Sequence, residues 1–280
     1  MKIILAEPIG YCYGVERALN ISKKALHSES GNIYTLGPII HNPQVIKKLK
    51  ENGIKIIENF ENIDIGTIII RAHGIAPEKI EEAKRIGHKV IDATCPFVKM
   101  NQRIASQLVK EDYFLLVIGE KKHPEILSIL ASANGPSIVI ENKNDFKILP
   151  DVKKVGVITQ TTQNMENFIF VVSHLIEKYR EIRIFNTICN ETIKRQNSAK
   201  NIADEVDLML IIGGKNSANT KRLANICKNI NKYSYHIETS NEIEEEWLLG
   251  VKKVGISGGA STPKWLIDEA IKKIKKLSSH

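Results

Sequence analysis

The stretch FLLVIGEKKHPE, residues 114–125, shows the pattern that decides the fold. Five apolar residues run into Gly119, and a short polar loop then ends in His123, Pro124 and Glu125. A short apolar run bounded by a turn residue is typical of a buried strand. Because such runs alternate with helical segments along the chain, the sequence predicts βα units and parallel sheets.

The pattern recurs in IYTLGPIIHNP (33–43) and LMLIIGGKNSAN (208–219), and each copy follows a cysteine that opens a helical segment. The strand-end glycines lie 25, 24 and 24 residues after Cys12, Cys95 and Cys189. A repeat with so long a period favours stacked copies of one supersecondary unit. We therefore predict three similar α/β lobes, 1–95, 96–188 and 189–280, arranged as a pseudo-threefold trefoil.

Polar side chains stand at matched offsets after these strands. In the loop after the repeated strand, the first third carries His41, the second carries His123 and Glu125, and the third carries Ser217 and Asn219. A later strand in each third ends in a second loop, which carries His73, Thr161 and Ser261 in turn. Each loop alone also fits a helix cap or a solvated turn. In open α/β sheets, however, ligands bind beyond the carboxyl ends of the strands. Together these loops predict a polar ring that binds an anion.

Three thiols on a common axis would form a metal site with one open position. Helix N-termini lower thiol pKa values and favour thiolate ligands. The spacing leaves two options open, which are a zinc ion and a [4Fe–4S] cluster with one iron lacking a protein ligand. Cys227 breaks the repeat and is expected to be a buried structural thiol. The remaining histidines are expected at the surface: His27, His88, His174, His236 and His280.

Composition and charge exclude several classes of function. The chain has 280 residues and a formal net charge of +8, which suits an anionic small substrate. No apolar run approaches the roughly 18 residues of a membrane span, and no signal peptide is recognised. Basic residues are not interleaved with stacking aromatics, so no nucleic-acid partner is expected. We predict a cytoplasmic enzyme without a membrane or nucleic-acid partner.

The ordered motifs resemble a known family along essentially the whole chain: GYCYGVERA, PIIHN, AHG, DATCP, GEKKHPE, TQTT, GGKNSANTKRL, EEW and GGASTP. They are similar to those of the 4-hydroxy-3-methylbut-2-enyl diphosphate reductases, the last enzymes of the non-mevalonate isoprenoid pathway. The resemblance implies reductive removal of an allylic hydroxyl, with isopentenyl and dimethylallyl diphosphate as products. It also implies one [4Fe–4S] cluster with one iron free of protein ligands, and a one-electron donor protein, either ferredoxin or flavodoxin.

The resemblance also assigns roles to residues. It implies Cys12, Cys95 and Cys189 as cluster ligands, and Glu125, Thr161 and His123 as catalytic residues. The implied substrate pocket comprises His41, His73, His123, Thr161, Ser217, Ala218, Asn219 and Ser261. Ala218 stands where many members have serine, so a backbone contact there would survive whereas a hydroxyl contact would not.

Three other readings remain open on the sequence. A quinolinate-synthase-like enzyme would use three cysteines and an open iron without net reduction, but the HPE, TQTT and KNSAN loops argue against it. A non-enzymatic redox sensor with a labile cluster would need an output surface, and the sequence shows no recognition helix. A zinc protein is the third alternative.

Overall fold

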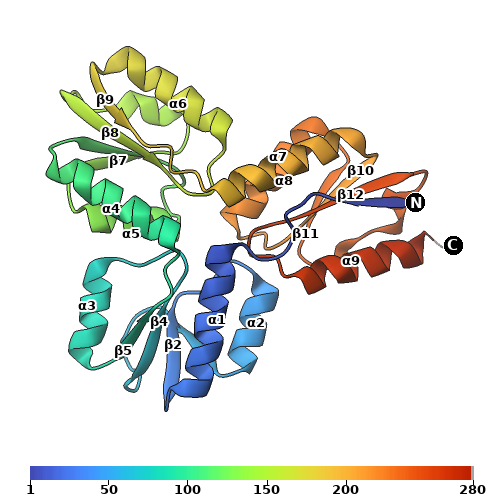
Figure 1. Ribbon diagram of the computed structural model, residues 1–280, viewed down its shortest axis with the longest axis horizontal. Coiled ribbons are helices and arrows are strands. Elements are labelled where there is room, and N and C mark those ends of the chain that lie inside the picture. Colours follow the sequence, from blue (N-terminus) through green and yellow to red (C-terminus); the bar gives the residue numbers. More distant parts are fainter. Residues whose placement is uncertain (279–280) are drawn as a thin grey trace. The chain divides into compact units, whose positions relative to one another are not determined.

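A computed structural model describes residues 1–278 of the chain and contains three parallel four-stranded sheets (Figure 1). The first two sheets have the same strand order, β3-β2-β4-β5 and β7-β6-β8-β9. The third sheet repeats it as β11-β10-β12-β1, so the N-terminal strand is its edge. The predicted α/β fold with three similar parallel-sheet lobes is therefore confirmed.

The strands are short and mostly apolar. Their bounds in chain order are β1 (Lys2–Leu5), β2 (Asn32–Leu36), β3 (Ile54–Ile57), β4 (Gly66–Ile70), β5 (Lys89–Asp92), β6 (Phe114–Ile118), β7 (Ser137–Ile140), β8 (Lys154–Thr159), β9 (Glu181–Ile184), β10 (Leu208–Ile212), β11 (Ser234–Ile237) and β12 (Lys253–Gly258). The central strands β4, β6, β8 and β10 are almost completely buried. Parallel sheets with continuous apolar strands require cover on both faces.

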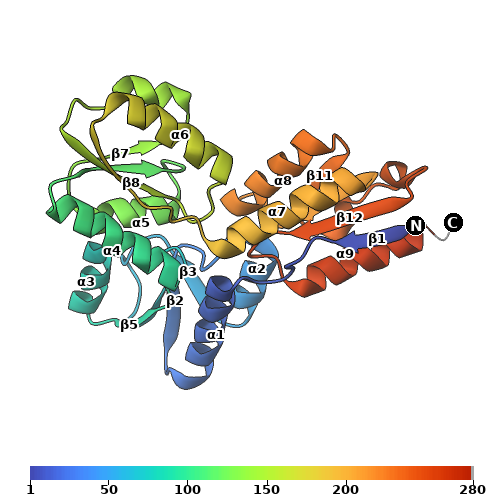
Figure 2. The ribbon, with the colours of Figure 1, turned by 45° about the horizontal axis from the view of Figure 1, so that its top comes forward.

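Helices supply that cover. Their bounds are α1 (Tyr13–Ser28), α2 (Pro43–Glu51), α3 (Pro77–Ile86), α4 (Pro96–Lys110), α5 (Pro124–Ala133), α6 (Met165–Lys178), α7 (Asn190–Glu205), α8 (Ala218–Ile230) and α9 (Lys264–Leu277), with short 3-10 helices at Lys143–Ile148, Ser240–Glu242 and Glu245–Leu248. Figure 2 shows the arrangement on the third sheet, where α7 and α8 lie on one face and α9 lies on the other.

The core of the third sheet explains this two-sided cover. Leu210 and Ile256 point toward Ile267 of α9 in one apolar cluster. Alternate residues of the same strands, such as Met209, pack against Ala199 of α7 in another cluster. Because side chains alternate across a strand, one apolar run fills both cores.

The chain divides into two compact units. Unit 1 comprises residues 1–15, 41–46 and the chain from Asn190 onward, and it contains the third sheet. Unit 2 comprises residues 16–40 and 47–189, and it contains the first two sheets. The lobe boundaries 1–95, 96–188 and 189–280 stay a prediction, although β1 pairs in parallel with β12 rather than with a strand of the first lobe.

The expected surface position of His88 is wrong. His88 is 4% exposed, and its Nδ1 accepts a hydrogen bond of 3.2 Å from the Gly66 amide. Its ring also lies edge-on to Tyr34. His27 and His174 are exposed, His236 is partly buried, and His280 lies outside the described residues.

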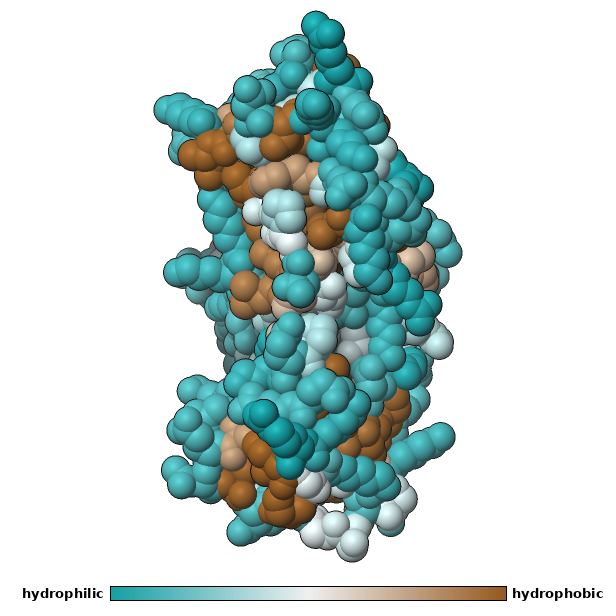
Figure 3. Space-filling model, turned by 90° about the vertical axis from the view of Figure 1, so that its left-hand side faces the viewer, coloured by the Kyte–Doolittle hydropathy of each residue, from teal (hydrophilic) through white to brown (hydrophobic). Residues whose placement is uncertain are grey.

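Figure 3 shows one face of the molecule, which is largely hydrophilic with hydrophobic side chains in separate patches. Within residues 1–278, none of the helices has the length and apolar character that crossing a bilayer requires.

Candidate functional site

The three repeated cysteines begin their helices in the same way. Each is partly exposed, forms no disulfide and directly precedes a helix. Each donates its backbone N–H to the carbonyl of the second residue after a strand: Cys12 to Ala260 (3.0 Å), Cys95 to Ala72 (2.9 Å) and Cys189 to Thr161 (2.9 Å). The strands concerned, β12, β4 and β8, occupy the same place in their sheets. The repeat inferred from spacing is therefore present in the backbone hydrogen bonds.

Cys227 is a different kind of thiol, as predicted. Its side chain is completely buried in a cluster with Leu223 and Ala199. Burial raises the pKa of Cys227 to about 12, so the thiol stays protonated at neutral pH. It is unsuited to bind a metal, because the thiolate is the binding form.

Glu125 and Thr161, in unit 2, form a buried pair. Glu125 is 2% exposed and lies in the first turn of α5, and Thr161 follows β8. The Thr161 amide donates to Glu125 Oε1 at 2.7 Å, and the Thr161 hydroxyl donates to Oε2 at 2.8 Å. Both carboxylate oxygens are thus held by one residue, whose carbonyl also accepts from Cys189. A carboxylate, a hydroxyl and a candidate ligand loop are therefore directly connected.

Two histidines lie close to this pair within unit 2. His123 is 8% exposed and caps α5, since its Nδ1 accepts from the Glu125 amide at 3.2 Å. Its ring meets that of His73 edge-on, with centroids 5.4 Å apart. The Ser128 hydroxyl bridges the carbonyls of His73 (2.9 Å) and Glu125 (2.8 Å). The structure thus brings four predicted residues of this unit together.

Unit 1 gathers the other predicted polar residues. The Ser261 hydroxyl donates to the His41 carbonyl at 2.9 Å, and Ala260 next to it accepts from Cys12. Gly214 lies against the same carbonyl, which an added Cβ would approach to 2.9 Å. The loops of His41, Ser261 and Cys12 are therefore parts of one connected region of this unit.

The N-terminus of α8 presents donors suited to an anion. Ser217 caps the helix by accepting from the Thr220 amide at 3.3 Å, and Ala218 and Asn219 form its first turn. Asn219 is 8% exposed, yet its Nδ2 has no hydrogen-bond partner among residues 1–278. A helix N-terminus attracts anions, and a buried amide without an acceptor is costly unless a ligand supplies one. This end of the helix therefore fits an oxyanion.

A tight glycine contact borders that site. An added Cβ on Gly259 would lie 2.0 Å from the Thr220 hydroxyl oxygen. Because real Cβ atoms do not approach so closely, only glycine is compatible with this packing. The backbone at Gly259 therefore packs directly against a threonine of α8.

Two arginines support the cysteine loops, and the sequence analysis did not identify either. Arg195 of α7 is 2% exposed and donates to the carbonyls of Pro8 (2.8 Å), Gly10 (2.8 Å) and Gly258 (3.2 Å). It therefore ties the segment before Cys12 to the end of β12. The buried face of α7 recurs at Thr192, Arg195, Ala199 and Ala203, and this helical spacing was the available signal.

Arg17 of α1 has a similar role in unit 2. Its Nη1 donates to the Thr94 carbonyl at 3.1 Å, and its Nη2 donates to the Asp92 carbonyl at 3.5 Å. The Asp92 carboxylate accepts from the Thr94 amide at 2.8 Å and pairs with Lys99 at 2.6 Å. Although burial acts to raise the pKa of Asp92, these partners hold it below its usual value. The residues before Cys95 are thus fixed by one arginine and one carboxylate.

The donor set fits an iron–sulfur cluster. Three partly exposed thiols lie at helix N-termini, whereas the fourth is buried and protonated. Cysteine thiolates are the usual protein ligands of such clusters. Cys12 belongs to unit 1, and Cys95 and Cys189 belong to unit 2.

Comparison with known proteins gives consistent results. A family model described as LytB protein matches residues 3–275. The 4-hydroxy-3-methylbut-2-enyl diphosphate reductase of Geobacter sulfurreducens is 47% identical over 279 residues, covering 100% of this chain and 99% of that protein. The Aquifex aeolicus protein of the same name is 48% identical over 280 residues, covering 99% of this chain and 97% of that protein.

Two solved structures are also similar. An (E)-4-hydroxy-3-methyl-but-2-enyl diphosphate reductase, described as the terminal enzyme of the non-mevalonate pathway, is 47% identical with a TM-score of 0.73. The match covers 99% of this chain and 100% of that one. The E-1-hydroxy-2-methyl-but-2-enyl-4-diphosphate reductase from Plasmodium falciparum is 31% identical with a TM-score of 0.92, covering 99% of this chain and 88% of that one.

Proposed function

Because the chain belongs to the LytB family of 4-hydroxy-3-methylbut-2-enyl diphosphate reductases, we propose that it reduces that allylic diphosphate. The family predicted from the ordered motifs is thus confirmed, and the chain is an enzyme, an oxidoreductase of isoprenoid synthesis. In the proposed reaction the allylic C–O bond breaks and one C–H bond forms. Two electrons and two protons are consumed, and water leaves with isopentenyl or dimethylallyl diphosphate as product.

Cys12, Cys95 and Cys189 are the proposed ligands of one [4Fe–4S] cluster, with one iron free of protein ligands. An iron–sulfur cofactor fits the family, and the partly exposed thiols at three helix N-termini support these ligands. When bound, the cluster would supply electrons and a Lewis-acidic iron. The protein supplies the loops that hold the three thiols in place.

Glu125 is the proposed proton donor, with Thr161 as the relay. In the structure both Thr161 donors point to the Glu125 carboxylate, which suits the ionised acid. Protonation of Oε2 would reverse the second bond, because a carboxylic acid then donates to the Thr161 hydroxyl oxygen. The hydroxyl proton of Thr161 is thereby released toward the substrate oxygen. The buried pair is the single observation that carries this proposal.

Polar donors of the chain would hold the diphosphate. In unit 1, Ser217, the amides of Ala218 and Asn219, His41 and Ser261 are the proposed contacts. The Asn219 side-chain amide, buried without a protein acceptor within the described chain, supports this part of the pocket. An amide contact at Ala218 needs no hydroxyl, so the alanine there is compatible with binding.

In unit 2, His73 and His123 are the proposed contacts. His123 Nδ1 accepts from a backbone amide, so the neutral ring carries its proton on Nε2. Nε2 is then a donor for a phosphate or hydroxyl oxygen. A ferredoxin or flavodoxin as electron donor and a cytoplasmic location complete the proposal.

The decisive test replaces Glu125 by glutamine and measures anaerobic turnover of the diphosphate with reduced methyl viologen. Glutamine keeps the size of the side chain and removes the ionisable proton, so we expect turnover to fall on the order of 100-fold or more. The iron content and visible spectrum should stay unchanged. Glu177→Gln on the exposed face of α6 is the matched control. Turnover of Glu125→Gln within threefold of the control would remove Glu125 from the mechanism.

A further inference from the structure

Helix α4 presents exposed apolar and basic side chains together. Phe97 and Met100 lie one turn apart and are 37% and 45% exposed. Arg103 and Lys110 are exposed and Lys99 is partly exposed. We refer to Phe97, Lys99, Met100, Arg103 and Lys110 as the α4 surface. The helix thus carries three cations together with two of the exposed large apolar side chains of the described chain.

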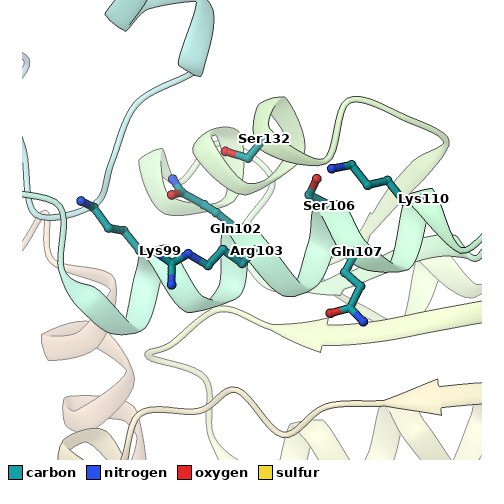
Figure 4. A pocket seen from close by; sticks show the side chains of 7 residues that line it. All are labelled: Lys99, Gln102, Arg103, Ser106, Gln107, Lys110 and Ser132. Atoms are coloured by element: carbon teal, nitrogen blue, oxygen red, sulfur yellow. The ribbon is translucent and has the colours of Figure 1, made fainter.

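The α4 surface borders a groove without acidic side chains. The groove has a volume of about 520 Å³ and is lined by Lys99, Arg103 and Lys110 with glutamine and serine side chains of α4 and α5. Figure 4 shows the three cations along one helix. Lys99 pairs with Asp92, whereas the side chains of Arg103 and Lys110 have no hydrogen-bond or ion-pair partner within residues 1–278. The groove therefore carries uncompensated positive charge.

The α4 surface begins beside a proposed cluster ligand. Cys95 is the residue directly before α4, and its carbonyl accepts from the Lys99 amide at 3.0 Å. Phe97 and Met100 follow Cys95 by two and five residues, which corresponds to roughly 3 and 8 Å along a helix axis. A partner seated on these side chains would therefore be close to the Cys95 thiol.

This combination fits one kind of partner. Arginine, methionine and aromatic residues are enriched in protein interfaces, and electron-transfer interfaces are small and transient. A stripe of basic groups attracts an acidic partner and speeds its arrival. Nucleic acid fits less well, because stacking sites need successive aromatic side chains and Phe97 is the single one in this set.

We propose that the α4 surface docks the acidic protein that delivers electrons one at a time. The inference rests on the proposed reductase function, which consumes two electrons per turnover. Each docking event oxidises one carrier by one electron, and two events supply the pair that cleaves the C–O bond. Lys99, Arg103 and Lys110 would form the charged contacts, and Phe97 and Met100, at the start of the helix, would add apolar contacts nearer Cys95.

The test compares two electron sources in the anaerobic holoenzyme. The double variant Arg103→Glu/Lys110→Glu is assayed with reduced methyl viologen, and separately with an acidic bacterial ferredoxin and an acidic flavodoxin. We expect kcat/KM for the protein carrier to fall on the order of tenfold or more, mainly through KM. Its dependence on ionic strength should flatten, because two charges of the contact are reversed. Turnover with methyl viologen should stay within twofold of wild type.

The matched control is Lys272→Glu/Lys275→Glu on the exposed face of α9, which changes the net charge by the same amount. Equal carrier kinetics in the two double variants would overturn the docking proposal, as would wild-type turnover with viologen and with neither carrier. Absence of wild-type turnover with viologen would instead overturn the proposed function. The visible spectrum and circular dichroism of each variant show that fold and cluster are intact.

Discussion

The segments before Cys12 and Cys95 end in the same backbone hydrogen bond but are held by different supports. Before Cys12, one completely buried arginine, Arg195, binds three carbonyls. Before Cys95, the partly exposed Arg17 binds two carbonyls at 3.1 and 3.5 Å, and the Asp92 carboxylate adds a third support. The same backbone geometry can thus be held by one side chain, which we call concentrated support, or by two side chains, which we call distributed support.

The largest expected effect is a difference in alkylation rate between the thiols of Cys12 and Cys95 and the buried thiol of Cys227. In cluster-free protein, iodoacetamide should label Cys12 and Cys95 at similar rates, because both are partly exposed. Cys227 has a pKa of about 12 and no exposure, so it should react on the order of 1,000-fold more slowly than an ordinary thiol. Mass spectrometry of the labelled peptides measures the rates. Comparable labelling of Cys227 in folded protein would contradict its structural role.

The two arginines should differ in their contribution to stability. Arg195→Met leaves three buried carbonyls without their donor and should lower the free energy of unfolding by about 3 kcal/mol. Arg17→Met removes two weaker, partly hydrated bonds and should cost about 1 kcal/mol. Urea unfolding of cluster-free protein measures both, with Lys194→Met, whose side chain is 68% exposed, as control. Equal losses at the two arginines would abolish the distinction between concentrated and distributed support.

Amide hydrogen exchange shows which segment each arginine substitution destabilises. The Cys12 amide should exchange faster in Arg195→Met but not in Arg17→Met, because the Cys12 segment depends on Arg195 alone. The Cys95 amide should respond only to Arg17→Met. Uniform acceleration across all amides would indicate general destabilisation instead.

The smallest expected effect is a pH-dependent contribution of Asp92, in the segment before Cys95, to the free energy of unfolding. The pKa of Asp92 is lower in the folded than in the unfolded protein, so its carboxylate stabilises the fold above the unfolded value near 3.9. That contribution is lost as the pH falls through the folded pKa. Because the Asp92 side chain is 38% exposed, screening limits it to about 0.5 kcal/mol. Asp92→Asn should be less stable than wild type at pH 7, and urea unfolding should show this difference shrinking as the pH is lowered below the unfolded value.

The three lobes could be predicted from the sequence, because the pattern of a cysteine, a helical segment and a strand ending in glycine occurs three times in it. The strand-end glycines Gly37, Gly119 and Gly213 each donate to the last carbonyl of a neighbouring strand, which explains their matched offsets from the cysteines. The family was also predicted correctly, because its motifs lie in these repeated loops and the family model matches residues 3–275. The roles of the site residues stay predictions that the contacts of Glu125 with Thr161 support.

Other features were not accessible from periodicity. The pairing of β1 with β12 joins segments about 250 residues apart, and no local pattern specifies such a partner. His88 was misjudged because its burial depends on the Gly66 amide and on Tyr34, which lie on other strands. Arg195 looked like an ordinary helix residue, since charged residues are rarely completely buried unless paired.

The place of β1 has a consequence for how the chain acquires its fold. β1 precedes the other described strands in the chain, and its partner β12 is made about 250 residues later. At the usual 5–20 residues per second, the apolar segment Ile3–Leu5 waits on the order of 10–50 s for that partner. The first two sheets are complete within residues 32–184 and have no such delay. The third sheet is therefore the last of the three described sheets to be completed during synthesis, because its edge strand β1 must wait for β12.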